Sequence, residues 1–168
     1  VFFMHLIWCF DRLEIIKTRP CLVLDAAHNA ESASRLRDAL RDLFPHKRLF
    51  LVFGASADKD VAGMFRHLLP ITQHLILVQA VHPRALDPDE LVEQAHAVSF
   101  AGQTEVIAPV ETAVERALSL ATPDDLICVA GSLFVLGEVR DMFHLKPGHV
   151  ACLEAKPVPM GKASTGSG

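Results

Sequence analysis

CLVLDAAHNAESAS, residues 21–34, is the stretch that decides the predicted fold. Four apolar residues (21–24) end abruptly at Asp25, and a short turn with His28 and Asn29 leads into a segment with helical periodicity. A buried strand that stops on a carboxylate and turns into a helix is typical of α/β sheets, which bind ligands beyond the carboxyl ends of their strands. Since a helix N-terminus favours anions, the stretch predicts an anion-binding turn at Asp25, His28 and Asn29.

The same alternation of strand and helix continues along the chain. The short turn at 18–20 indicates that the first two strands pair antiparallel, whereas the later, wholly apolar strands are typical of parallel strands buried on both faces. The pattern predicts an α/β, three-layer, doubly wound domain with a mostly parallel sheet of about six strands and an antiparallel edge strand. The predicted strands are 12–17, 21–25, 48–54, 74–80, 104–108 and 125–132, and the predicted helices are 29–44, 60–70, 88–98, 109–120 and 133–143.

The composition of the chain argues against several classes of protein. The 168 residues are enough for one domain, and the net charge of −4 gives no basic excess of the kind that nucleic-acid binding needs. No apolar run is long enough to span a membrane. The four cysteines form no CxxC pair, so we expect no disulfide framework and a cytoplasmic location.

The two ends of the chain differ from its middle. Residues 1–10 are apolar and lack the basic region and cleavage site of a signal peptide, so we expect an atypical segment that is the remnant of an upstream linker. Residues 156–168 are rich in Pro, Gly, Ser and Lys, and we expect the whole segment 146–168 to be a disordered tail. The expected domain is therefore 11–145.

Polar residues also follow the other predicted strands, and each has an ordinary structural explanation. Asn29, Asp60 and Ser132 are good helix caps, and the cations can simply be solvated. Because parallel strands end at one edge of a sheet, their alignment nevertheless predicts a polar site there. The residues concerned are Asp25, His28 and Asn29 after the first such strand, Lys59 and Asp60 after the next, then His82 and Arg84, and finally Gly131 and Ser132.

Several kinds of catalytic motif are missing from the sequence. There is no GxSxG nucleophile elbow, no GxGxxG and no GxxxxGK[ST] phosphate loop. Asp25 and His28 leave open a metal-dependent hydrolase as an alternative, but two candidate ligands are too few to predict a metal site.

Five blocks of sequence together resemble one known family. The blocks are RLEII (12–16), RPCLVLDAAHNAESA (19–33), FGASADKD (53–60), HPRA (82–85) and AGSLFVLGEVR (130–140). The DxAHN block and the final GSLxxxGEVR block are together fairly specific. Over about residues 11–143 the chain is similar to the C-terminal domain of folylpolyglutamate synthase/dihydrofolate synthase, a family of ATP-dependent amide-bond-forming ligases of the Mur ligase type.

The resemblance implies a reaction and a missing partner. In this family an N-terminal P-loop domain holds ATP and magnesium, and a Rossmann-like C-terminal domain closes over it. ATP phosphorylates a carboxylate of folate or dihydropteroate, and the amino group of L-glutamate attacks the acyl phosphate. Because the P-loop domain is absent from this chain, it must be supplied in cis or in trans, and we expect the isolated chain to be inactive.

The resemblance also implies residue roles. Arg12 corresponds to the arginine that reaches the ATP phosphates, and Asp25 to the aspartate that contacts the nucleotide. His28 and Asn29 correspond to the turn near nucleotide and glutamate, with Arg12 and His28 as the catalytic pair. Ser132 corresponds to a serine near the glutamate site, and Lys59 and Asp60 to a Lys-Asp pair that we assign to substrate binding.

The sequence departs from the family pattern at two positions of the turn, and alternatives remain. Ala26 replaces a glycine, and Ala30 replaces a proline. The alternatives are a non-catalytic nucleotide- or glutamate-binding module, a remnant fragment, and the C-terminal domain of another Mur-type ligase.

Overall fold

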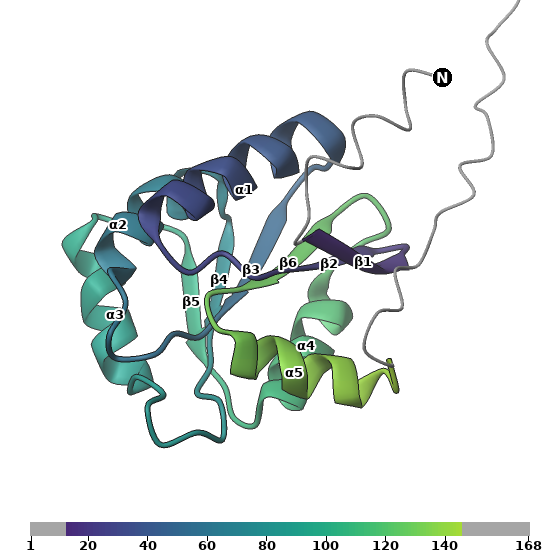
Figure 1. The fold of residues 1–168 in the computed structure, drawn as a ribbon. Coiled ribbons are helices and arrows are strands. Elements are labelled where there is room, and N and C mark those ends of the chain that lie inside the picture. The colour runs from purple at the N-terminus through teal and green to yellow at the C-terminus, as the bar shows by residue number, and fades with distance from the viewer. Residues whose placement is uncertain (1–12, 146–168) are drawn as a thin grey trace, which may run out of the picture.

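The fold was analysed in a computed structural model that describes residues 13–145 (Figure 1). The predictions for Arg12 and for segments 1–10 and 146–168 lie outside the described residues. The strands are β1 (Leu13–Thr18), β2 (Cys21–Asp25), β3 (Leu49–Phe53), β4 (His74–Leu77), β5 (Gln103–Val106) and β6 (Leu126–Ala130). The helices are α1 (Ala30–Leu43), α2 (Val61–Leu68), the 3₁₀ turn η2 (Leu69–Ile71), α3 (Pro88–Ala97), α4 (Val110–Leu120) and α5 (Leu133–Met142).

The six strands form one sheet in the order β1-β2-β6-β3-β4-β5. β1 pairs antiparallel with β2, with Leu13 opposite Asp25, and every other pairing is parallel. The predicted fold class, a mostly parallel sheet with an antiparallel edge strand, is therefore confirmed. β6 is the last strand within residues 13–145, yet it lies between β2 and β3 in the middle of the sheet.

Helices cover both faces of the sheet. α1, α2 and α3 lie on one face, and α4 and α5 lie on the other (Figure 1). Side chains alternate along the strands, so Val23 joins the first core while its neighbours Leu22 and Leu24 join the second. Burying each such aliphatic side chain contributes roughly 1.5–3 kcal/mol, and the two cores together fix the sheet that carries the site.

Most helices begin where the sequence predicts, because a polar side chain caps each first turn. The side chains of Asn29, Asp60, Asp87 and Ser132 accept hydrogen bonds from the first backbone N–H groups of α1, α2, α3 and α5. β4 ends at Leu77, three residues earlier than predicted. Its neighbour β3 ends at Phe53, whose carbonyl accepts from the backbone N–H of Val78 at 3.0 Å, so the pairing of the two strands stops just beyond Leu77.

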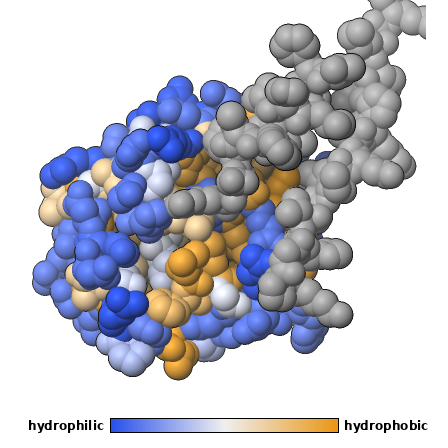
Figure 2. Space-filling model, in the orientation of Figure 1, coloured by the Kyte–Doolittle hydropathy of each residue, from blue (hydrophilic) through white to orange (hydrophobic). Residues whose placement is uncertain are grey.

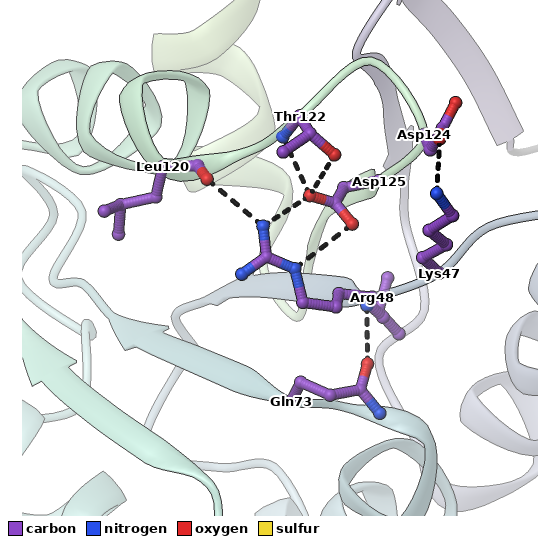
Figure 3. Close-up of polar contacts among 8 residues, drawn as sticks. Lys47, Arg48, Gln73, Leu120, Thr122, Asp124 and Asp125 are labelled. Atoms are coloured by element: carbon purple, nitrogen blue, oxygen red, sulfur yellow. Dashed lines mark hydrogen bonds and ion pairs between the residues drawn. The ribbon is translucent and has the colours of Figure 1, made fainter.

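Charged residues connect the amino-terminal ends of β3 and β6 through hydrogen bonds and ion pairs (Figure 3). The Arg48 guanidinium donates to both carboxylate oxygens of Asp125 at 2.6 and 3.2 Å, and Thr122 donates to the same carboxylate through its backbone N–H and its hydroxyl. Beside them, Lys47 pairs with Asp124 at 2.7 Å. These contacts tie the start of β3 to the loop between α4 and β6.

Within residues 13–145, no helix combines the length and the apolar character needed to cross a membrane.

Candidate active site at the carboxyl ends of the strands

A hollow of about 570 Å³ lies at the carboxyl ends of the parallel strands, within the usual range for small-molecule sites. Figure 2 shows apolar surface around the junction of β6 and α5, where Leu133 and Phe134 are exposed. Four loops, those after β2, β3, β4 and β6, contribute to the walls. The lining residues are Ala26, His28, Ser56, Asp58, Lys59, Arg84, Gly131, Ser132, Leu133 and Phe134.

The turn after β2 is held by its own polar groups. Asp25 is buried and accepts a hydrogen bond from the backbone N–H of Ala27 at 2.7 Å. The Nδ1 of His28 lies 3.1 Å from the carbonyl of Ala26. A carbonyl only accepts, so in the neutral ring this Nδ1 carries the proton and Nε2 is the acceptor. His28 lines the hollow, whereas Asn29 caps α1 beside it.

The loop after β3 supplies charge. Lys59 lines the hollow with its ammonium 3.0 Å from the Asp58 carboxylate. The hydrogen bond from Lys59 lowers the pKa of Asp58, and the positive charge of Arg84 lowers it further. Asp60 lies outside this lining and caps α2 by accepting from the backbone N–H of Gly63 at 2.9 Å. The cationic side chains of Lys59 and Arg84 and the single carboxylate of Asp58 therefore line the hollow. This excess of positive charge favours an anionic ligand.

The loops after β3 and β4 are joined by backbone hydrogen bonds. Ala57 donates to the carbonyl of Arg84 at 2.9 Å, and Leu86 donates to the carbonyl of Ala55 at 2.8 Å. These bonds bring Arg84 beside Lys59 even though 24 intervening residues separate them in the sequence. The exposed Arg84 thus belongs to the same wall as Lys59.

The loop after β6 closes the centre of the hollow. Gly131 has φ +106°, and a Cβ there would collide with the carbonyl of Gly54 and the ring of Phe53. Ser132 is buried, and its hydroxyl accepts from the backbone N–H of Phe134 at 3.2 Å. Gly131 therefore allows the backbone to pass close to the end of β3 before α5 begins.

Five of the residues selected from the sequence line the hollow together: His28, Lys59, Arg84, Gly131 and Ser132. Asp25 and Asn29 belong to the same turn as His28 but are not lining residues. Sequence reasoning did not select Ser56, Asp58 or Phe134. The polar character of the loop at 55–60 was a usable signal for the first two, whereas an apolar residue in the first turn of a helix is normally assigned to the core. Among the described residues no group of three or more His, Cys, Asp or Glu side chains is placed to hold a metal ion.

A match to a family profile establishes the relationship of this chain to known proteins. The profile of the glutamate ligase domain of Mur ligases matches residues 11–133. This chain belongs to the Mur ligase family. Its glutamate ligase domain is 39% identical, over 129 residues, to a probable bifunctional folylpolyglutamate synthase/dihydropteroate synthase of Halobacterium salinarum. The predicted resemblance is thereby confirmed.

Solved structures share the fold of this glutamate ligase domain. A Mycobacterium tuberculosis folylpolyglutamate synthase, solved with ADP and AMPPCP, is 31% identical with a TM-score of 0.75 over 81% of this chain. A bifunctional folylpolyglutamate synthase/dihydrofolate synthase, solved with Mn, AMPPNP and L-glutamate, is 26% identical with a TM-score of 0.70 over 79% of this chain.

The chain corresponds to a minor part of these proteins. It covers 16% of the halobacterial relative, 32% of the mycobacterial chain and 31% of the protein solved with L-glutamate.

Proposed function

We propose that this glutamate ligase domain forms one wall of the active site of an ATP-dependent ligase that adds L-glutamate to folate or dihydropteroate. The observation that carries the proposal is the cationic hollow in which His28, Lys59 and Ser132 meet. It is supported by the relationship to folylpolyglutamate synthases, one of which was solved with an ATP analogue and L-glutamate.

The geometry suggests how the residues divide between the ligands. L-Glutamate is an anion, and Lys59, the Ser132 hydroxyl and the N-terminus of α5 offer it a positive charge and hydrogen-bond donors. Asp25 and Asn29, in the turn after β2, are assigned to the nucleotide together with Arg12. Asp60 stays a proposed substrate contact, although its carboxylate caps α2 in this structure.

The proposed reaction joins an acyl group to an amine. ATP would phosphorylate the carboxylate of the folate or dihydropteroate, and the amino nitrogen of L-glutamate would displace phosphate to form the amide. The ammonium of L-glutamate must first lose a proton, and the Nε2 of His28 is a suitable acceptor because Nδ1 is held against the carbonyl of Ala26. Arg12, outside the described residues, would counter the charge on the phosphates.

The proposed enzyme needs a P-loop domain in cis or in trans. The sequence has no GxxxxGK[ST] motif, so ATP and magnesium would be held mainly by that partner. The residues of this chain fit an anionic ligand, and they would exclude water when the two domains close.

The decisive experiment is complementation with the P-loop domain of a related synthase. The mixture should add radiolabelled L-glutamate to folate or dihydropteroate when ATP is present, while each part alone is inactive. Failure to restore turnover, under conditions where the intact relative works, would contradict the catalytic proposal.

A second candidate is a binding module that does not catalyse. It is favoured by the cationic hollow, whose lining comes entirely from this chain. Calorimetry of the isolated chain with ATP, ADP and L-glutamate separates the two, because a stand-alone module should bind at least one of them without a partner. Absence of binding to all three would remove this candidate.

A further inference from the structure

One carboxylate outside the proposed site links α5 to the loop that follows β4. The backbone N–H of Val81 donates to Oε1 of Glu138 at 2.7 Å, although the two residues are 57 positions apart in the sequence. Val81 is 89% exposed, whereas Ala80 just before it is buried in the core. Burial therefore fixes the start of the loop, and at Val81 itself the backbone is held by the hydrogen bond to α5.

A ring contact lies next to this hydrogen bond. The imidazole of His82 stacks on the ring of Phe134, with centroids 3.6 Å apart and planes at 13°. Phe134 and Glu138 are four residues apart in α5, so they lie on the same face of the helix. Two successive loop residues, Val81 and His82, are thus held by two successive turns of α5.

Within the loop after β4, His82 in turn contacts the backbone of Arg84. The backbone N–H of Arg84 lies 3.2 Å from Nδ1 of His82, and its carbonyl accepts from Ala57. Arg84 lines the hollow, as does Phe134. The position of the Arg84 charge therefore depends on two restraints: the backbone hydrogen bonds to the loop after β3, and the contacts of α5 with the start of the loop after β4.

We propose that Glu138 is a positioning residue that fixes the β4–α3 loop, and with it Arg84, on the amino-acid side of the site. This inference rests on the proposed function. β4 is separated from β2 by β6 and β3 in the sheet, so the loop after β4 and the turn assigned to the nucleotide contribute to different walls of the hollow that both line. Glu138 acts through the hydrogen bond that it accepts from Val81.

Two neutral replacements separate this hydrogen bond from the charge of Glu138. Glu138→Gln keeps an acceptor oxygen, whereas Glu138→Leu removes it at similar size. Glu115→Leu, at an exposed position of α4, is the matched control. The NMR spectrum of the chain should show an upfield move of the Val81 amide proton and altered His82 ring signals in Glu138→Leu only. Glu138→Ala serves as the second variant if Glu138→Leu lowers the unfolding midpoint.

The catalytic readout uses the chain reconstituted with a P-loop domain. Glu138→Leu should raise the KM for L-glutamate at least fivefold and change the KM for ATP less than twofold, while Glu138→Gln and Glu115→Leu stay within twofold of the parent for both. Equal damage by Glu138→Gln and Glu138→Leu would overturn the inference, as would equal rises in both KM values or unchanged NMR signals in Glu138→Leu. If no version of the reconstituted enzyme ligates glutamate, the proposed function fails, and the NMR comparison alone decides the role of Glu138.

Discussion

The imidazole of His28 is held within its own turn, with Nδ1 3.1 Å from the carbonyl of Ala26. Because the ring lies in the wall of the hollow, His28→Ala should affect chemistry more than folding. We expect it to lower ligation by the reconstituted enzyme about a hundredfold and to lower the free energy of unfolding by less than about 1 kcal/mol. Initial rates and urea unfolding check both quantities. Arg12→Ala is predicted to behave alike, and parallel losses of activity and stability would contradict the assignments.

Gly131 tolerates no side chain without strain. Its φ of +106° is unfavourable for any residue with a Cβ, and the added carbon would strike the carbonyl of Gly54. Gly131→Ala should therefore destabilise the fold by about 2 kcal/mol or more. Gly137 of α5 is the control, since a Cβ there meets nothing within 4 Å. Gly137→Ala should stabilise the helix by about 0.5–1 kcal/mol, and equal destabilisation of the two variants in urea unfolding would refute the explanation.

Asp125 gives the stability a defined dependence on pH. Burial raises the pKa of its carboxyl, but the hydrogen bonds from Arg48 and Thr122 outweigh burial and hold the pKa at about 2, below the usual 3.8. At pH values above the usual pKa of an aspartate, the ionised carboxylate therefore stabilises the fold. This stabilisation is lost as the pH falls from about 5 to about 2.

Asp125→Asn removes this titration. The variant should lose about 2 kcal/mol of stability near neutral pH, and its further loss on acidification should be smaller than that of the parent chain. Asp124→Asn, next to it but in an exposed pair with Lys47, should leave the unfolding midpoint almost unchanged. Thermal melts at a series of pH values check this, and identical pH profiles for parent and Asp125→Asn would contradict it.

Among the elements, α1 depends on a capping box. The Asn29 side chain accepts from the backbone N–H of Ser32 at 2.8 Å, and the Ser32 hydroxyl accepts from the backbone N–H of Asn29 at 3.1 Å. Asn29→Ala should cost about 1 kcal/mol of unfolding free energy, whereas Asn29→Asp keeps the acceptor and should cost much less. Urea unfolding of the two variants checks this, and equal losses would show that the cap contributes little.

Local signals predicted most elements because the decisive interactions are local. The buried run 21–24 ends at Asp25 as expected, and the caps at Asn29, Asp87 and Ser132 begin their helices at the predicted positions. The early end of β4 was not predicted, because it follows from the end of its partner β3 at Phe53, in a distant segment of the chain.

The site was predicted only in part for the same reason. His28, Lys59 and Ser132 follow strands and could be selected from the sequence, since parallel strands end at one edge. The place of Phe134 in the wall depends on its stacking with His82, a contact between distant segments. The link between Glu138 and Val81 has no local signal either.

At the scale of the whole described domain, residues 13–145, one sheet is shared by two cores. Phe65 of α2 belongs to the core on one face and Val139 of α5 to the core on the other. Because the strands between them contribute to both, we expect unfolding in a single transition. Phe65→Ala should lower the free energy of unfolding by about 3–5 kcal/mol. It and Val139→Ala should each lower the midpoint of the same, single unfolding transition. Far-UV circular dichroism and amide hydrogen exchange check this, and separate transitions for the two faces would contradict it.

The central place of β6 has a consequence for synthesis on the ribosome. β2 and β3 precede it in the sequence by about a hundred and about eighty residues, and each forms a parallel ladder with it. A nascent chain that has not yet extruded residues 126–130 has two half-sheets without their shared middle strand, with unpaired backbone edges on both. The domain therefore completes its fold only after almost all of residues 13–145 have been translated, and until then the edges of β2 and β3 lack their partner strand.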